Sequence, residues 1–471
     1  MAESWEALER TASRALEAVG EDRGSPEVPL RRWPRAVDLF AGARALASVD
    51  PGPAVLLAET AVWMRLRGPL ERYEAAGERA RVRLRPTEPG VPWRLVPAAI
   101  AGEDGRARRE LLWQGADALA TTLRPEAVEV VDELRACAAE LLPVHTDAVG
   151  LGDEAIRSGF VLDATDDAFA ELDAWAARQL EIDRSRATWS DRLRLLVAPA
   201  VLREVPPATW GDLATGWLPR VGLEGALGRV RDRHAPAETL ALGVDPWPGD
   251  PSVLRGRPRR LGFDAGEMFG ALGACVAAAV GPSVSPGARR GVHRALDGAA
   301  HALVRSFLVD RTFLSRDAGL GGVARERAGR AALHAELLRL RWDAAMARWL
   351  PSALRREAGV SERFVAETTR AWGAAPSPAW AVHLAALAFE PGGAWPGRSA
   401  ARVRGALHAL ALRETLRERF DEDWFRNPRT GAAVRGAWDA LRALGPTATG
   451  DAATEDAALV RWLRDSVDGL R

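Results

Sequence analysis

Apolar side chains that recur at three- and four-residue intervals are the feature that most constrains the fold of this chain. Trp5, Leu8, Ala12, Leu16 and Val19 follow this spacing, which places side chains on one face of an α-helix. The same periodicity predicts helices over 34–48, 53–82, 107–121, 125–142, 165–183, 187–204, 264–280, 288–309, 323–350, 361–373, 376–389, 399–420, 429–444 and 453–469. Short strands are expected between 236 and 263, where turn signals separate brief extended runs. The sequence predicts a mainly α fold with at most a few short strands.

The length of the chain predicts more than one lobe. A chain of 471 residues is long for a single core. Proline- and glycine-rich breaks occur at Gly20–Pro34, Pro86–Arg106, Pro236–Pro258, Gly281–Gly291 and Gly392–Gly397, and no repeat of fixed period suggests a solenoid. We expect an N-terminal helical lobe over residues 1–260 and a C-terminal helical lobe over residues 261–471.

Charge and composition exclude several classes of function. Lysine plus arginine and aspartate plus glutamate each total 64, so the chain lacks the excess positive charge typical of nucleic-acid binding. It contains no lysine, which excludes Schiff-base chemistry and a Walker-type phosphate site. Cys137 and Cys275 lie in apolar helical stretches and are expected to be buried, inert thiols. The acidic, amphipathic N-terminus is unlike a signal peptide, and no apolar run spans a bilayer, so we expect a cytoplasmic protein with no membrane partner.

The most informative segment is LRERFDEDWFRNPRTG, within residues 407–441. It reads as the end of one helix and the start of another, with Pro428 as a first helical residue and Asn427 as its cap. Trp424 and Phe425 are expected to anchor the terminal helices. This run resembles the C-terminal end of bacterial zinc oligopeptidases (gluzincins) of the thimet oligopeptidase and oligoendopeptidase F kind. The resemblance covers residues 264–445 and implies a two-lobed helical fold with a substrate cleft between the lobes.

The resemblance also implies an upstream zinc helix with the motif His-Glu-x-x-His, in which the glutamate takes the proton of the attacking water. This motif is absent. The nearest match is LDGAAHAL, where Asp297 replaces the first histidine, Gly298 replaces the glutamate and His301 keeps the second histidine. A glycine at position 298 removes the general base, which argues against hydrolysis by the family's mechanism.

A third ligand in this family is a glutamate of the next helix, and Glu326 is the best match. Asp297, His301 and Glu326 form a poorer zinc set than two histidines and a carboxylate. His293, Asp297 and His301 recur every fourth residue, but the two histidines are about 12 Å apart along a helix and cannot share one metal. We therefore expect no cofactor and no metal, with residual zinc binding as a disfavoured alternative.

The family's oxyanion-stabilising tyrosines are missing as well. Arg398 and Arg402 occupy the region where they are expected, and with His293 they are candidate cleft residues. His408, on the following helix, is interpreted as a surface or packing residue. The leading hypothesis is a non-catalytic pseudoenzyme that binds a peptide or protein partner in the cleft. Two alternatives remain: an active metal-dependent peptidase with a rearranged site, and a helical scaffold protein unrelated to peptidases.

Several other residues are interpreted as structural. His383 lies among apolar residues and is expected to be a satisfied core histidine. His334 and Glu336 are two residues apart and point in different directions on a helix. Trp342 and Trp349, two of eighteen tryptophans, share one helical stripe typical of a core. The mixed-charge run Arg106, Arg108, Arg109 and Glu110 reads as a solvated face.

Overall fold

A computed structural model gives the structure of the chain. It describes residues 51–85, 87–145, 151–229, 231–233, 243–245, 253–255, 265–280, 296, 298–355, 357–387, 398–444 and 451–468. Helices dominate this part of the chain, and the prediction of a mainly α fold is confirmed. None of the helices within it is both long and apolar enough to cross a bilayer.

The long helices follow the predicted periodicity. The bounds of the helices are α3 Pro51–Arg79, α4 Val96–Gly102, α5 Arg106–Thr122, α6 Arg124–His145, α7 Leu151–Gln179, α8 Trp189–Leu196, α9 Pro199–Glu204, α10 Trp210–Thr215, α11 Trp217–Arg220, α12 Ala265–Val280, α14 Arg311–Arg316, α15 Gly322–Leu354, α16 Val360–Trp372, α17 Trp380–Leu387, α18 Arg398–Phe420, α19 Thr430–Leu444 and α20 Ala452–Asp468. The short helices α4, α10, α11 and α14 lie in stretches for which the sequence predicts no helix. Residues 298–305 are also helical and continue into the 3-10 turn η6 Ser306–Leu308. The helices expected at the N-terminus and over 34–48 lie outside the described residues.

Two boundaries differ from the prediction. Helix α7 begins at Leu151, fourteen residues before the predicted start, and it packs against α15. The segment predicted as one helix over 187–204 is two helices, α8 and α9. Ala198 between them has a left-handed backbone (φ 48°), and the following Pro199 cannot donate the hydrogen bond that a continuous helix needs.

Strands are few and short in the described part of the chain. β1 Arg81–Val82 pairs antiparallel with β2 Val91–Pro92. β3 Arg231–Arg233, β4 Gly243–Asp245 and β5 Val253–Arg255 form a second sheet in the order β3-β5-β4. Two of these three strands lie in the region where short strands are predicted.

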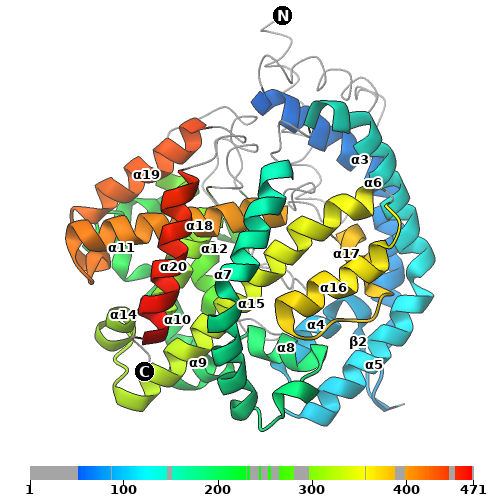
Figure 1. Ribbon diagram of the computed structural model, residues 1–471, viewed down its shortest axis with the longest axis horizontal. Coiled ribbons are helices and arrows are strands. Elements are labelled where there is room, and N and C mark those ends of the chain that lie inside the picture. Colours follow the sequence, from blue (N-terminus) through cyan, green and yellow to red (C-terminus); the bar gives the residue numbers. More distant parts are fainter. Residues whose placement is uncertain are drawn as a thin grey trace, which may run out of the picture.

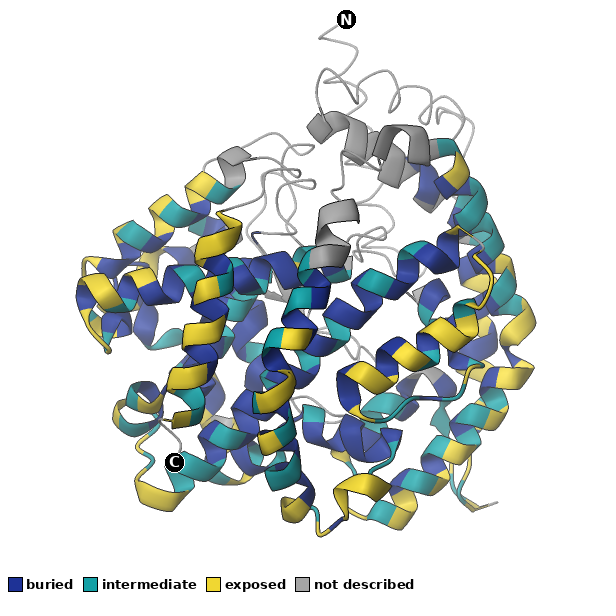
Figure 2. Cartoon of the chain, viewed as in Figure 1, coloured by how far each residue is buried: buried dark blue, intermediate teal, exposed yellow. Residues whose placement is uncertain are grey.

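Helix α15 organises the core. It crosses the molecule diagonally in Figure 1 and packs against α7, α16, α18, α8 and α9. Most of its buried residues are small or apolar, with His334 and Arg341 as buried polar exceptions, and Trp349 is almost fully buried, as expected for a core stripe. Figure 2 shows exposed residues concentrated on the outer faces of the helices. The buried apolar side chains form one cluster that includes residues on both sides of position 260, so the proposed lobe boundary stays a prediction.

The C-terminal segment is fixed by aromatic and ionic contacts. Trp424 and Phe425 are fully buried, and both rings lie close to Phe307, as predicted for anchors of the terminal helices. Asn427 accepts a hydrogen bond from the backbone N–H of Arg429 (3.0 Å), but α19 begins one to two residues later than predicted, at Thr430.

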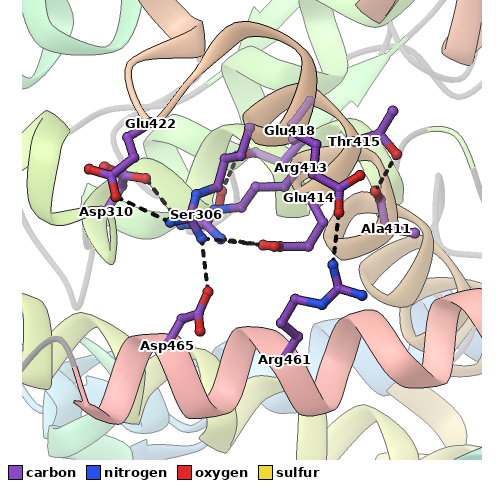
Figure 3. A network of polar contacts seen from close by, with 12 residues as sticks. Ser306, Asp310, Ala411, Arg413, Glu414, Thr415, Glu418, Glu422, Arg461 and Asp465 are labelled. Atoms are coloured by element: carbon purple, nitrogen blue, oxygen red, sulfur yellow. Dashed lines mark hydrogen bonds and ion pairs between the residues drawn. The ribbon is translucent and has the colours of Figure 1, made fainter.

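An ionic network ties α18 to α20 and to the turn before α14. Within it, Arg413 donates to Asp310 (3.1 Å) and Arg461 donates to Glu418 (2.8 Å) (Figure 3). Asp310 also caps α14 by accepting hydrogen bonds from two backbone N–H groups. These contacts lie in the C-terminal half of α18, whereas the candidate site described next involves its N-terminal end.

Candidate functional site

The 298–305 helix carries His301 and lies between α12 and α18. Its contact with α12 is close because α12 has glycines at the crossing. A Cβ atom on Gly270 would lie 2.3 Å from Cε1 of His301, and one on Gly273 would lie 2.4 Å from the carbonyl oxygen of Ala300. A larger residue at Gly273 would press against the backbone of the 298–305 helix, and one at Gly270 would push the His301 ring out of its position. The glycines of α12 therefore set the position of the His301 ring.

Gly298 lies at the contact with α18. A Cβ atom there would be 3.2 Å from the carbonyl oxygen of Ala401 and 3.4 Å from Cα of Arg402. The same Cβ atom would be 3.5 Å from Cα of Gly405, which lies on the same face of α18. Two helix backbones that meet this closely leave no space for a longer side chain or a water molecule. The position aligned with a catalytic glutamate is thus a helix–helix contact.

A set of charged side chains surrounds His301, and we call it the His301 cluster. Its members are His301, Glu267 of α12, Arg305 of the 298–305 helix, Glu336, Arg339 and Asp343 of α15, and Arg402 of α18. Three arginines face three carboxylates, so the cluster is neutral when the imidazole is uncharged.

Glu267 is the central acid of the His301 cluster. Its Oε2 lies 3.5 Å from Nε2 of His301, and its Oε1 lies 3.1 Å from Nε of Arg339 and 3.5 Å from Nη1 of Arg305. Arg305 in turn lies 2.6 Å from Glu336. The side chain of Glu267 is 42% exposed and that of His301 is 25% exposed. Water therefore reaches the acid and the imidazole, although protein surrounds both.

Burial and charge determine the protonation states. Burial lowers the pKa of His301, and the neighbouring charges of Arg305 and Arg402 lower it further against the opposing effect of Glu267. For Glu267, burial acts to raise the pKa, but His301, Arg339 and Arg305 together hold it well below its usual range. At neutral pH the pair is therefore a neutral imidazole beside an ionised carboxylate.

The described residues of the His301 cluster do not by themselves form a zinc site. Zinc sites in proteins use at least three side-chain ligands, and no group of three histidine, cysteine or acidic side chains gathers at one point within the described residues. His301 and Glu267 supply two donors, and the carboxylate is already held by Arg305 and Arg339. A divalent cation placed here would also meet the positive charge of these arginines.

The positions predicted for the degenerate site are only partly brought together. His301 and Gly298 share the 298–305 helix, whereas Asp297 and His293 lie outside the described residues. Glu326 pairs with Arg330 on its own helix (3.2 Å) and is 44% exposed. It precedes Glu336, a member of the His301 cluster, by about 15 Å along α15, and the acid that meets His301 is Glu267 instead.

The two arginines predicted as cleft residues both belong to α18. Arg402 is 48% exposed and lies 3.6 Å from Asp343. Its charge acts on His301, which associates it with the His301 cluster. Arg398 begins α18, and its side chain lies outside the described residues.

Sequence reasoning did not identify five members of the cluster as site residues: Glu267, Arg305, Glu336, Arg339 and Asp343. One signal was present for Arg305, which follows His301 by four residues and so shares its helix face. No comparable signal existed for Glu267, because the contact between α12 and the 298–305 helix depends on the tertiary fold.

The histidines interpreted as structural have separate partners. His383 is fully buried, accepts or donates at both ring nitrogens, and is a satisfied core histidine as predicted. His334 lies 3.3 Å from the buried Asp173, whereas Glu336 belongs to the His301 cluster, so the two do not share a site. His408 is partly buried and lies 3.3 Å from Glu455.

The interpretation of residues 106–110 as a solvated face is wrong at one position. Arg109 is 1% exposed and donates to the fully buried Asp191 of α8 (2.8 Å). It also donates to the backbone oxygens of Glu103 and Asp104. A helix pattern of mixed charge could not reveal the carboxylate 82 residues away that pairs with this guanidinium.

Comparison with known proteins gives a likeness in fold. No family model matches the chain, and no curated protein is similar to it in sequence. The crystal structure of a Chlamydophila abortus protein described as a candidate peptidase superposes with a TM-score of 0.55 at 9% identity, covering 93% of this chain and 81% of that one. The structure of a protein named BsuCP covers 99% of this chain and 98% of its own, with a TM-score of 0.47 and 11% identity. The chain therefore shares its overall fold with the Chlamydophila abortus protein.

Proposed function

We propose that this protein is a non-catalytic relative of zinc oligopeptidases that binds a peptide or protein segment at the His301 cluster without cutting it. The observation that carries the proposal is the contact of Gly298 with the backbone of α18. A general base cannot stand at this position, because even a methyl group would press against the carbonyl oxygen of Ala401. The peptidase-like fold supports the relationship with peptidases.

The chemistry of the His301 cluster suits binding. Glu267 and Arg402 are each nearly half exposed, so one carboxylate and one guanidinium of the cluster are both accessible to solvent. An acid accepts from peptide N–H groups or an N-terminal amine, and a guanidinium donates to peptide carbonyls or a carboxylate. The ion pairs with Arg305 and Arg339 hold Glu267 in place and reduce the entropy that binding would cost.

A hydrolysis assay and a metal measurement on the same preparation test the absence of catalysis. We expect no stoichiometric zinc in protein purified without chelator, and no cleavage of mixed peptides with added zinc or cobalt. Peptide turnover that His301→Ala abolishes would overturn the proposal and favour an active, rearranged hydrolase. Stoichiometric zinc lost in the same variant would do the same.

Binding is tested with a library of short peptides by calorimetry. We expect Arg402→Ala and Glu267→Gln each to weaken the binding of selected peptides about tenfold, the effect of one charge-assisted hydrogen bond. Arg461→Ala is the matched control, because Arg461 is also about half exposed and pairs with Glu418 on the outer face of α18. Equal binding by all variants, or no binding by the wild type, would favour a scaffold protein.

A further inference from the structure

Six tryptophans form a continuous file through the core, and the proposed function does not use them. Trp93 stacks on Trp380 (5.0 Å between ring centroids), and Trp380 stacks on Trp113 (4.8 Å). Trp113 is 6.2 Å from Trp189. The file is completed by Trp342 and Trp372, each within 5.2 Å of Trp189. Each step falls within the range of aromatic contact.

A tyrosine with a built-in base stands at one end of this file. Tyr73, the chain's single tyrosine, lies 6.2 Å from Trp93 and is 3% exposed. Its hydroxyl is 2.9 Å from Nδ1 of His383. Nε2 of His383 is 2.7 Å from the carbonyl oxygen of Ala120, which can only accept a hydrogen bond. Nε2 therefore carries the proton, Nδ1 is the free lone pair, and the Tyr73 hydroxyl donates to it.

We propose that Trp113, Trp380 and Trp93 of this file form a one-electron relay that carries oxidising equivalents from the partly buried Trp113 to Tyr73, with His383 as the proton acceptor. Indole and phenol are among the side chains most easily oxidised by one electron. A phenol that loses an electron becomes a strong acid, so a hydrogen-bonded base makes its oxidation easier. Tyr73 is therefore the favoured resting place of the oxidising equivalent.

Electrons and protons balance as follows. A one-electron oxidant of the oxyl-radical or high-valent metal class takes an electron from Trp113, which becomes a radical cation. Trp380 then gives an electron to Trp113, and Trp93 gives one to Trp380. The electron vacancy thereby moves from Trp113 to Trp93. Tyr73 finally gives an electron to Trp93, its O–H bond breaks, and an N–H bond forms at Nδ1 of His383. The oxidant has gained one electron, and the protein holds a neutral tyrosyl radical and an imidazolium.

The surroundings of His383 tolerate the transferred proton. The imidazolium keeps a partner at each nitrogen, since Nε2–H still donates to Ala120 and Nδ1–H points to the phenoxyl oxygen. Burial and the positive charge of Arg124 oppose the imidazolium, whereas the hydrogen bond to Ala120 and the negative charge of Glu126 favour it. Burial lowers the pKa of His383, so the base is neutral and ready to accept the proton at neutral pH.

Flash oxidation of the full chain tests the relay. Photoexcited ruthenium tris-bipyridine, quenched by a cobalt(III) ammine, supplies the one-electron oxidant in solution. The radicals are identified by transient absorption and by electron paramagnetic resonance of frozen samples. We expect a tyrosyl radical in the wild type, and its assignment is unambiguous because the chain has a single tyrosine.

Variants separate a relay from a purely structural aromatic core. Tyr73→Phe should replace the tyrosyl signal with a tryptophan radical. Trp380→Phe and Trp113→Phe, the second at a less buried position, should each reduce the tyrosyl yield several-fold. His383→Gln should also reduce it, although Tyr73 and all the tryptophans remain. Trp349→Phe is the matched control, because Trp349 is buried against Phe364 outside the file, and its yield should equal that of the wild type.

Circular dichroism identifies any variant that does not fold, and Trp113→Phe keeps the test decisive if Trp380→Phe is one of these. The absence of a tyrosyl radical in the wild type would overturn the relay. A tyrosyl yield unchanged in Trp113→Phe, or lowered equally in Trp349→Phe, would also overturn it.

Discussion

Gly298 shows how one missing side chain serves two purposes at the scale of the residue. Its lack of a Cβ atom allows the 298–305 helix to approach α18, and under the proposed function it also leaves this position without the acid of the peptidase motif. A glutamate introduced at position 298 would therefore disturb the packing of the two helices.

This dual role predicts the effect of Gly298→Ala. The new methyl group would lie 3.2 Å from the Ala401 oxygen, so we expect a loss of about 1–3 kcal/mol in the free energy of unfolding, the usual effect of overpacking. The control is Gly436→Ala in α19, where a Cβ meets nothing within 4 Å and where we expect a gain of about 0.5–1 kcal/mol. Urea denaturation measures both. Equal stability of wild type and Gly298→Ala would contradict the close contact.

At the residue scale the sequence identified some positions and missed their partners. LDGAAHAL drew attention to Gly298 and His301, and the described structure places both at interhelical contacts. It could not identify Glu267 as the acid beside His301, nor Asp191 as the acid beside Arg109, because these pairs are formed by residues 34 and 82 positions apart. Local spacing contains no information on such distant contacts.

Buried ion pairs join the helices at the scale of the element. Asp173 of α7 is 1% exposed and contacts the equally buried Arg192 of α8, and Arg184 donates to it (2.8 Å). His334 of α15 lies on the other side of the same carboxylate (3.3 Å). One acid thus connects three helices around the centre of the molecule.

The connection predicts a specific dependence on pH. Burial acts to raise the pKa of Asp173, but His334 and Arg192 lower it to about 2 from an unfolded value of 3.8. The native state therefore holds this proton less tightly than the unfolded state. The resulting stabilisation, about 2 kcal/mol, is present above pH 4 and is lost as the pH falls towards 2. Burial also lowers the pKa of His334, so its protonation below pH 6.5 destabilises the fold in the same direction.

Urea unfolding at pH 7, 5, 4 and 3 measures this dependence. Asp173→Asn should cost about 3 kcal/mol at pH 7, because it leaves the buried Arg192 without its counter-ion, and it should flatten the acid limb of the profile. Asp163→Asn in the same helix is the control, since Asp163 is 68% exposed and its loss should change stability by less than about 1 kcal/mol. Identical acid limbs in wild type and Asp173→Asn would refute the assignment.

At the scale of the whole molecule, one apolar cluster includes helices from both halves of the chain. Helix α15 packs against α7 and α8 from before residue 260 and against α16 and α18 from after it. Helix α17 also returns to pack against α5 and α6. Contacts of this kind make unfolding of one half costly to the other.

We therefore expect a single cooperative unfolding transition, in which tryptophan fluorescence and far-ultraviolet circular dichroism change together. Leu338→Ala, at a fully buried position in α15, should shift the whole transition by about 2–5 kcal/mol. Val460→Ala, at an exposed position in α20, should shift it little. Two separated transitions, with only one moved by Leu338→Ala, would instead support lobes that fold independently on either side of residue 260.

The sequence by itself determined the helices and most of their bounds, because helical periodicity is a local property that needs no distant partner. The sequence also shows that the chain has no lysine, no His-Glu-x-x-His motif and no second tyrosine, so it excludes the chemistry that depends on these groups. Tertiary structure alone decided which charges meet at His301, why Gly298 must stay small, and how six tryptophans align with Tyr73. Each of these depends on contacts between segments far apart in the chain, which form only when the helices pack.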